Sequence, residues 1–460
     1  MGRGRGVARG LLGGIGLALA TAALAVEDGA RRESAPAVED GAPPEGARAV
    51  EDGAPPEGAT LGWTELLALR ELLPPEIWRH RDRFFHPDMR MRIGPARRLY
   101  TPPRSFAEAT ARNAGRARLD ADGNLHGHTP GEGLPFPPET IDPAAPDAAL
   151  RWAWNLARRH RGAGPRGRFR LVDLPENRGA ARTTTGEWFQ LVPGGADSSF
   201  VAGGRFHEPA PVRHLAWRQR RPREASLEAS LPDETFVYLP GARKVRRAAG
   251  GWVDGLFAPN YRSPSAPGAP GGAGGGRGIA ATEPLRRGWL GLALRPNAYR
   301  WRWLGEREVL APLNAARAGY PLAPGRSWGP SGLSAADDRW ERRRAVVIQG
   351  ALREPGQGFA TLTLYVDAQT QQPLYLATRD GAGRLVETGI LLHRYSDDLE
   401  GYPPGAGGER ASVFDPVAAV FVEPRGGSGW RRESYDALSS PPHDAELQRL
   451  TGPGFLDRGR

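Results

Sequence analysis

The sequence predicts a mainly β protein of the α+β type, with helices packed on a large curved antiparallel sheet or half-open β-barrel. Four apolar runs, at residues 342–352, 359–366, 373–379 and 385–393, follow one another with only short polar turns between them. Strands joined by short turns, without a helix in between, pair antiparallel. Helical patterns are confined to the first third of the chain. The order of elements therefore favours helices on one antiparallel sheet over a parallel α/β fold.

Three segments have the apolar spacing or the boundary signals of helices. Residues 63–73 repeat apolar side chains at helical spacing and stop at two prolines. Residues 75–78 begin with a proline, which favours the first turn of a short helix. Residues 147–161 carry an apolar stripe and end in four basic residues before Gly162, as is typical of a helix C-terminus.

The β pattern begins near residue 168, where apolar and polar residues start to alternate. The clearest hairpin has two such runs on either side of Pro240-Gly241. The proline at position 312 indicates an edge strand or the end of a strand. The strands expected before the meander are residues 168–172, 187–192, 235–239, 242–247, 299–305 and 307–314.

The N-terminus has the features of a secretory signal peptide. Three arginines occur in the first nine residues, an uncharged apolar run covers residues 11–24, and a small-x-small triplet ends at Ala25. The run of about 14 residues is shorter than the ~20 that span a bilayer. We therefore expect a signal peptide over residues 1–25 that is cleaved after Ala25; an uncleaved N-terminal anchor is the alternative.

A twelve-residue repeat follows the expected cleavage site. The motif Ala-Val-Glu-Asp-Gly-Ala occurs three times, starting at positions 25, 37 and 49. Because segments rich in Pro, Gly, Glu and Ala cannot bury an apolar face, we expect residues 26–60 to form a disordered acidic spacer. Residues 61–400 are expected to form one domain with a Gly/Pro-rich loop at 263–278, and residues 401–460 an irregular, peripheral tail.

The composition excludes several classes of protein. The absence of cysteine among the 460 residues excludes disulfides, thiolate zinc sites, a cysteine nucleophile and a lipid-modified N-terminal cysteine. We therefore expect a soluble periplasmic protein without a lipid anchor. Lys244 is the only lysine, and the arginines that make up the rest of the 62 basic residues are mostly scattered. Despite the net charge of +10, we expect no nucleic-acid partner, because nucleic-acid sites need clustered basic patches.

The histidines offer one candidate metal site. His126 and His128 alternate on an extended segment with Glu132 nearby, so two imidazoles could face one cation. The surrounding residues have the composition of a loop and supply no third ligand at a diagnostic spacing, so an exposed polar loop is the default interpretation. His393 ends an apolar strand and is interpreted as a packed or surface residue. We expect neither a metal nor another cofactor.

No local motif supports catalysis. The chain has no G-x-S-x-G nucleophile elbow, and its glycine-rich run at 272–278 has no strand-turn-helix context that would hold a phosphate. The acidic pairs at 337–338 and 397–398 lie in polar, turn-like segments, which explain them without an acid–base role. We therefore expect a protein that is not an enzyme.

Aromatic and basic side chains supply the remaining candidates. An incompletely covered sheet face suits a lipid or another apolar ligand, although each aromatic residue alone is more commonly a core residue. The basic strand of the 235–247 hairpin could contact anionic headgroups or an acidic partner; a solvated strand face is the alternative. The expected ligand-binding residues are Trp188, Phe236, Tyr238, Trp301, Trp303 and Tyr365, with Leu374 beside them, and the expected anion contacts are Arg243, Lys244, Arg246 and Arg247.

Several segments together carry a family resemblance. They are Leu-Pro-Phe-Pro at 134–137, the arginine-rich hairpin at 238–247, and residues 299–305, 308–314, 364–375 and 379–383. From Phe84 to Tyr395 the chain resembles exported bacterial proteins catalogued as domain of unknown function 1329, a group similar to the lipoprotein carriers LolA and LolB. Where the family has an acidic stretch before Tyr299, this chain has Ala-Thr-Glu-Pro-Leu-Arg-Arg at 281–287.

The resemblance implies a LolA/LolB-like half-barrel, closed by helices around an apolar cavity for acyl chains, without catalytic residues. It implies a periplasmic carrier of a lipid or lipidated protein that works with an inner-membrane transporter of the resistance-nodulation-division type. The alternatives are a non-enzymatic accessory or structural subunit of an envelope transport complex and, after it, an envelope hydrolase. An enclosed cavity, an exposed contact patch and a clustered catalytic set would distinguish the three.

Overall fold

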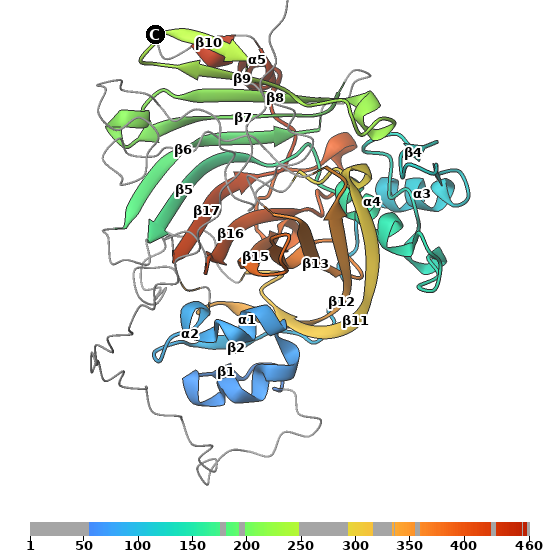
Figure 1. The fold of residues 1–460 in the computed structure, drawn as a ribbon, viewed down its shortest axis with the longest axis vertical. Helices are drawn as coiled ribbons and strands as arrows, with labels where there is room; N and C mark the ends of the chain where they lie inside the picture. Colours follow the sequence, from blue (N-terminus) through green and yellow to red (C-terminus); the bar gives the residue numbers. More distant parts are fainter. Residues whose placement is uncertain are drawn as a thin grey trace, which may run out of the picture. The chain divides into compact units, whose positions relative to one another are not determined.

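The fold in the computed structural model is drawn in Figure 1. The predicted signal peptide, nearly all of the repeat segment and the Gly/Pro-rich loop at 263–278 lie outside the described residues and stay predictions. The described residues are 55–174, 181–192, 198–247, 293–315, 334, 336–354, 359–424, 429–452 and 454–457.

Fifteen strands among the described residues form one open sheet. Every pairing in it is antiparallel except the short parallel one between β2 (Met91–Ile93) and β12. β1 (Thr60–Leu61) extends the sheet beside β2, and β3 (Arg118–Leu119) and β4 (Leu125–His126) form a separate small hairpin. Across the sheet, the main strands are β11 (Tyr299–Ala311), β12 (Arg339–Leu352), β13 (Thr361–Asp367), β14 (Pro373–Arg379), β15 (Leu385–Tyr395), β16 (Phe414–Val422), β17 (Trp430–Leu438), β5 (Arg166–Leu174), β6 (Arg182–Leu191), β7 (Ser198–Glu208), β8 (Ala216–Pro222), β9 (Glu234–Leu239) and β10 (Lys244–Arg247).

The predicted fold class is confirmed. The four runs of the predicted meander form β12 to β15, each paired antiparallel with the next. Figure 1 shows the strands stacked from β10 through β16 and then curling through β13 to β11. Two meanders, β5 to β10 and β11 to β17, join where β17 pairs with β5. As a result, β10 and β11 are consecutive in the chain but lie at opposite edges of the sheet.

The prediction of an irregular, peripheral tail over residues 401–460 is wrong. β16 and β17 lie in this segment and occupy the middle of the sheet, between β15 and β5. Val420 pairs with Ile390 on one side and with Arg432 on the other. Many of the glycines and prolines that suggested a tail lie between strands, as at 403–408, while Pro416 lies near the start of β16, beside a shift in its register against β15.

One strand replaces two that the sequence predicted separately. Residues 299–305 and 307–314 were expected as two strands, but β11 runs continuously through most of both. Its register against β12 shifts between Trp303 and Gly305, and Gly305 has a φ of 121°. A bulge of this kind bends a strand without ending it, and a positive φ favours glycine.

The three predicted helices are present: the 3-10 helix η2 (Trp63–Leu72), α1 (Pro75–Arg79) and α4 (Ala148–Arg158). Helix α3 (Arg104–Asn113) was not predicted. None of the helices among the described residues combines the length and apolar composition needed to cross a membrane. The remaining α-helices among the described residues are α2 (Arg81–Phe84), α5 (Asp444–Thr451) and α6 (Gly454–Asp457), and short 3-10 helices occur at Pro138–Thr140, Ala210–Val212, Arg223–Ser226, Pro296–Ala298, Ser396–Asp398 and Ala406–Gly408.

Both faces of the sheet are covered by apolar side chains. Strand alternation sends Val346 and Ile348 of β12 to one face and Val347 to the other. Helix α4 covers the first face with side chains that include Trp152 and Leu156, and we call this face the α4 face. The N-terminal segment from η2 to α2 covers the opposite face. We therefore expect any space for a ligand to lie beside α4 or at the ends of the strands.

Candidate ligand-binding cavity

Three of the predicted ligand residues lie on the α4 face. Trp188 of β6 is 2% exposed within the core of this face, and Trp301 and Trp303 of β11 pack against that core while partly exposed. The ring centroids of Trp303 and Trp152 of α4 are 6.4 Å apart. Helix α4 therefore fills the part of the face that was expected to be open.

The other predicted ligand residues lie elsewhere. Tyr365 and Leu374 are buried on the opposite face, beneath the N-terminal segment. Phe236 and Tyr238 of β9 pack in a small cluster with Phe455 of α6. The structure thus divides the predicted set among three apolar clusters and does not bring it together as one site.

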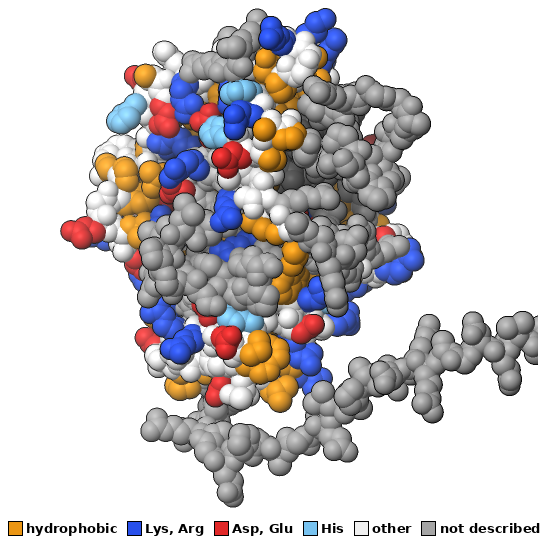
Figure 2. All heavy atoms as spheres, turned by 90° about the vertical axis from the view of Figure 1, so that its left-hand side faces the viewer, with side chains coloured by type: hydrophobic (Ala, Val, Ile, Leu, Met, Phe, Trp, Pro, Cys, Tyr) orange, Lys and Arg blue, Asp and Glu red, His pale blue; other side chains and the backbone are white. Residues whose placement is uncertain are grey.

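The basic side chains of the predicted hairpin are exposed. β10 forms one edge of the sheet, and Arg243, Lys244, Arg246 and Arg247 all have exposed side chains. Charged side chains on an edge strand also hinder pairing with another chain. Figure 2 shows one face of the molecule, on which Lys and Arg side chains are spread among acidic and apolar ones.

The two histidines of the metal candidate make separate hydrogen bonds. His126 Nε2 donates to Asp120 Oδ2 (2.9 Å), and His128 Nε2 donates to the carbonyl oxygen of Gly133 (3.0 Å). Gly127 between them has a φ of 72°, which breaks the alternation that would place both rings on one side. Across the described ranges, no three His, Asp or Glu side chains come close enough to share a metal ion.

The acidic pairs and His393 have structural environments. Asp337 Oδ1 accepts the backbone N–H of Arg90 (2.6 Å), and Asp398 Oδ2 accepts from Arg98 Nη1 (2.7 Å). His393 of β15 is fully buried, and burial lowers its pKa well below the usual range. Of the two interpretations of His393, the packed residue is therefore correct.

A cavity of about 590 Å³ lies beside the C-terminal end of α4. Its walls are α3, the loop at 159–163 and the segments near residues 130–132, 405–411 and 439–441; we call it the outer cavity. Its volume is in the range of small-molecule sites, and the buried apolar side chains of α3 supply part of its lining. Its charged lining residues are Arg112, Arg158, Arg159, Arg161, Arg410, Glu132 and Glu409.

A second cavity, of about 340 Å³, adjoins the outer cavity and is lined partly by Tyr100 and Phe414. Phe106 and His160 line both cavities, and their ring centroids are 5.0 Å apart. His160 Nε2 donates to the carbonyl oxygen of Ala411 (2.8 Å), which fixes the ring. The Phe106–His160 pair therefore forms the boundary between the two spaces.

Hydrogen bonds attach α3 near both of its ends. Asn113 Nδ2 donates to the carbonyl oxygens of Glu132 (2.7 Å) and Leu134 (2.9 Å). Ser105 Oγ donates to Glu409 Oε2 (2.8 Å). Because Glu132 and Glu409 themselves line the outer cavity, these bonds hold the helix as one of its walls.

A wider groove of about 750 Å³ runs beside β11 and β12, but several of its charges are paired. Arg343 Nε donates to Asp367 Oδ2 (2.8 Å), and Arg97 Nη2 donates to Glu308 Oε1 (3.0 Å). Charges that already neutralise each other attract a ligand weakly. The outer cavity is the stronger candidate because, within the described residues, its Arg158 and Arg161 have no such carboxylate partner.

The loop that follows α4 is held tightly against the sheet. The backbone N–H of Ala163 donates to the carbonyl oxygen of Ser439 (3.0 Å), and that of Gln190 donates to the carbonyl oxygen of Pro165 (2.8 Å). Gly164 has a φ of 94°, and a Cβ there would lie 2.1 Å from the carbonyl oxygen of Gln190. Only glycine fits this approach, and the fixed loop positions the arginines that precede it.

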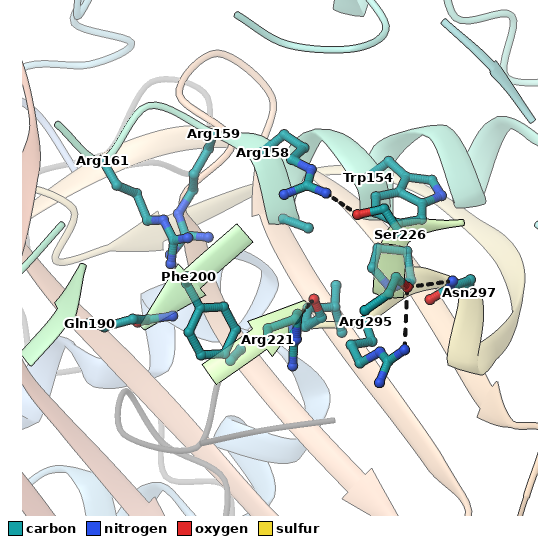
Figure 3. A pocket seen from close by; sticks show the side chains of 15 residues that line it. Trp154, Arg158, Arg159, Arg161, Gln190, Phe200, Arg221, Ser226, Arg295 and Asn297 are labelled. Carbon is teal, nitrogen blue, oxygen red and sulfur yellow. Dashed lines mark hydrogen bonds between the residues drawn. The ribbon is translucent and has the colours of Figure 1, made fainter. Parts of the chain in front are cut away.

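Figure 3 shows these arginines around a smaller cavity of about 30 Å³, which lies between α4 and strands β6 to β8; we call it the inner cavity. Arg159 and Arg161 extend together toward Gln190, whereas Arg158 turns the other way and donates to Ser226 Oγ. Arg158, Arg159 and Arg161 line the outer cavity as well. The three arginines therefore form a common wall of the two cavities.

Burial and mutual repulsion make these guanidinium groups unfavourable as cations. Burial, followed by the Arg221 charge, lowers the pKa of Arg158 to about 9 and that of Arg161 to about 10. Burial and the Arg161 charge lower the pKa of Arg159 well below its usual range. Because arginine stays protonated in proteins, these directions express a free-energy cost of folding the three cations together. A bound negative charge would offset that cost.

Asp415, at the start of β16, is a buried carboxyl group that Ser439 connects to the outer cavity. Ser439 Oγ donates to Asp415 Oδ1 (2.6 Å), and the Tyr402 hydroxyl donates to Asp415 Oδ2 (2.8 Å). Burial raises the pKa of Asp415 to about 6, although both hydrogen bonds act to lower it. The folded protein therefore holds this proton to a higher pH than the unfolded chain does.

We predict that Asp415→Asn changes the pH dependence of stability. The contribution of the Asp415 proton is fully present below the ordinary pKa of 3.8 and is lost as the pH rises through about 6. The asparagine variant does not ionise, so its free energy of unfolding relative to wild type should rise between pH 4 and pH 7, by on the order of 3 kcal/mol. Urea unfolding at several pH values measures this, and a difference that is constant with pH would contradict it.

Sequence reasoning identified the basic residues at the end of α4 only as a helix terminus. The structure makes Arg159 the C-cap residue of the helix and turns the arginines into a cavity wall. One signal could have indicated this role: no acidic residue occurs between Asp147 and Asp173. The positive charge of this stretch therefore has no local carboxylate to balance it.

Several solved structures are similar to the chain, among them three bacterial proteins. An outer membrane lipoprotein-sorting protein domain from Vibrio parahaemolyticus is 11% identical, with a TM-score of 0.40, over 68% of this chain and 100% of that chain. A DUF1329 family protein from Desulfovibrio piger is 13% identical, with a TM-score of 0.42, over 68% and 98%. A LolA superfamily protein from Nitrosomonas europaea is 12% identical, with a TM-score of 0.34, over 67% and 98%.

No curated protein matches the chain. The family described as "Protein of unknown function (DUF1329)" matches residues 82–261 and 291–407, which together make up more than half of the chain. The match includes most of the sheet together with α3 and α4, the two helices that border the outer cavity. It confirms the resemblance inferred from the sequence motifs, and the chain belongs to the DUF1329 family.

Proposed function

We propose that this protein is a periplasmic carrier that binds a lipid or the lipid part of a lipidated protein. The observation that supports the proposal best is the outer cavity. It has about 590 Å³ of space, borders a second cavity of about 340 Å³, and combines apolar residues with charged ones. Ligand sites commonly have this combination, in which apolar surface supplies affinity and polar groups supply orientation.

We also propose that the carrier is not an enzyme. Ser439 and His160 both line the outer cavity, but they do not act on each other as a nucleophile and a base would. Ser439 Oγ donates to Asp415, and His160 Nε2 donates to a backbone carbonyl. Covalent catalysis needs a nucleophile within hydrogen-bond reach of its base, so this arrangement supports binding over envelope hydrolysis.

Cargo exchange requires contact with a membrane or a partner, and β10 is the proposed contact. Its four basic side chains are exposed along one edge of the sheet, and juxtamembrane basic residues are attracted to anionic lipid at about 1 kcal/mol each. We propose an anionic membrane surface as the partner of this edge. Association with an inner-membrane transporter of the resistance-nodulation-division type remains part of the proposal, as does the alternative of an accessory transport subunit.

The carrier proposal predicts that filling the outer cavity abolishes lipid binding. Ala109 of α3 is buried and lines this cavity, so Ala109→Trp should block it and reduce binding of a fluorescent phospholipid at least tenfold. Ala111→Trp places the same side chain on the exposed side of α3 and should bind as wild type does. Native mass spectrometry of the wild-type protein should show co-purified lipid that the Ala109 variant lacks.

The same assay, run as extraction of the lipid from vesicles, tests the role of β10. Replacing Arg243, Lys244, Arg246 and Arg247 with glutamine should slow extraction from anionic vesicles and leave extraction from neutral vesicles unchanged. Equal rates from both kinds of vesicle would remove β10 from the proposal. Lipid binding that is equal in wild type and the Ala109 variant would remove the outer cavity.

A further inference from the structure

The arginine wall between the inner and outer cavities contains two cations, Arg158 and Arg161, whose charge no carboxylate of the described residues balances. Among the described residues, Arg158 and Arg161 form no ion pair with a carboxylate, and Arg161 forms no hydrogen bond either. Arg159 is 8% exposed; its Nη1 donates to the carbonyl oxygen of Leu156 (2.7 Å) and its Nε donates to Gln372 Oε1 (3.0 Å). These two bonds hold the guanidinium group in place at the wall of the cavity.

The contrast with Arg221, which lines the same inner cavity, is informative. Arg221 makes a two-point contact with Asp233, with Nε to Oδ1 at 2.9 Å and Nη2 to Oδ2 at 3.0 Å. This cation is thus given its own carboxylate, as buried charges require. Within the described part of the chain, Arg158 and Arg161 lack one, although they lie only partly exposed at the same cavity.

Hydrogen-bond donors around the inner cavity also lack acceptors. Gln190 is 4% exposed, and its Nε2 has no acceptor among the described residues; the same holds for Arg158 Nε. Figure 3 shows Gln190 below the ends of Arg159 and Arg161. Buried donors without acceptors are rare and indicate a missing polar partner. An acceptor beside Gln190 would satisfy this donor, and an anionic acceptor would also offset the charge of the neighbouring arginines.

One unsatisfied acceptor also lines the inner cavity. Asn297 Oδ1 is buried and has no donor among the described residues. In Figure 3, Asn297 lies at the opposite end of the cavity from Gln190, with Arg295 beside it. An anion would therefore find hydrogen-bond donors and positive charge at the end of the cavity formed by Gln190 and the arginine wall.

We infer that the arginine wall binds the carboxylate of a long-chain fatty acid, whose apolar chain lies in the outer cavity. The inference rests on the proposed function and adds to it the chemical class of the head group. The inner cavity has room for about two water-sized atoms, which is the number of oxygens in one carboxylate. Guanidinium groups bind carboxylates through two parallel hydrogen bonds.

The apolar part of the ligand has a matching space. Phe106, Ala109, Val192 and Ala411 line the outer cavity, which shares Arg158, Arg159 and Arg161 with the inner cavity. A phosphate diester has more oxygen atoms and a second substituent, which the inner cavity does not accommodate. Carboxylates and phosphates both present anionic oxygen atoms. The test therefore includes a single-chain phosphate monoester, which distinguishes a phosphate head group from a carboxylate.

The test compares oleate with oleyl alcohol, which has the same chain and a neutral head, in titrations of the full-length protein. We expect oleate to bind at least tenfold more tightly. Arg161→Gln should reduce the preference for oleate over the alcohol by roughly tenfold to hundredfold, because it removes a charge-assisted hydrogen bond. Arg161→Lys, which keeps the charge, should retain part of the preference. Arg168→Gln, an exposed position on β5, should retain all of it.

The outcomes separate this inference from the proposed function. If both amphiphiles bind equally and Arg161→Gln has no effect on their ratio, the carboxylate site is wrong while the carrier proposal stands. If neither oleate nor oleyl alcohol binds, the carboxylate site and the carrier proposal are both wrong. If oleoyl lysophosphatidate binds more tightly than oleate in an Arg161-dependent way, the head group is a phosphate and the carboxylate assignment is overturned. If only inorganic phosphate or acetate stabilises the protein, the site takes a free anion and the amphiphile is overturned.

Discussion

A chain that ends after Tyr402 is expected not to form the native sheet. It lacks β16 and β17, the two strands that connect the meander ending in β15 with the meander beginning in β5. The side chains of β16 alternate between the two cores: Ala419 and Phe421 pack on the α4 face, and Val420 and Val422 on the opposite face. Burial of one such large apolar side chain contributes about 1.5–3 kcal/mol. The loss of several such side chains from both strands is therefore comparable with the roughly 5–15 kcal/mol by which a domain is typically stable.

Circular dichroism, thermal unfolding and limited proteolysis measure this effect. We expect the shortened chain to show no cooperative transition. A chain that ends after Ser440 is the matched control, because it loses only α5 and α6, whose buried residues belong to the small cluster at β6, β8 and β9. The control should fold with a reduced melting temperature. A cooperative, native-like transition in the chain ending at Tyr402 would show that the central position of β16 and β17 is incorrect.

The second large effect is expected for Arg431→Met on β17. Arg431 is 1% exposed, its Nη2 lies 3.3 Å from Glu387 Oε2, its Nε lies 3.3 Å from Glu433 Oε1, and its Nη1 pairs with Glu423. Burial alone would lower the pKa of Arg431, but the three glutamates raise it above the usual range. Removing a cation that pairs with all three glutamates leaves buried carboxylates with less compensating charge, and breaking a buried ion pair in this way typically costs about 3–5 kcal/mol.

Urea unfolding at neutral pH measures the change in the free energy of unfolding. Arg168→Met is the matched control, since Arg168 pairs with Asp436 (2.9 Å) on the neighbouring strand while both side chains are mostly exposed. Exposed pairs contribute about 0–1 kcal/mol, so the control should lose no more than this. Equal losses in the two variants would mean that burial of the Arg431 network does not decide its contribution.

The sequence by itself determined the local structure and the family. Alternating side chains predicted most strands, and a proline and helical spacing predicted η2, α1 and α4, because each depends on neighbours in the chain. Strand β7 was not predicted, because its glycines obscure the alternation of apolar and polar side chains. Gly203 and Gly204 weaken the β pattern of β7, yet a Cβ at Gly204 would lie 2.1 Å from the Trp217 ring. The glycine there is a packing requirement that only the neighbouring strand reveals.

The tertiary structure decided which strands lie in the middle of the sheet and where the site is. The pairing of β17 with β5 joins residues more than 250 positions apart, and no local pattern specifies such a contact. The predicted aromatic residues were divided among three clusters because a strand sends alternate side chains to opposite faces and α4 fills one of them. The arginines at the end of α4 became a cavity wall because the folded loop brings them to β6, at a cavity whose lining residues include no carboxylate. Residue type and spacing thus specified the elements, whereas long-range burial and charge balance specified the candidate site.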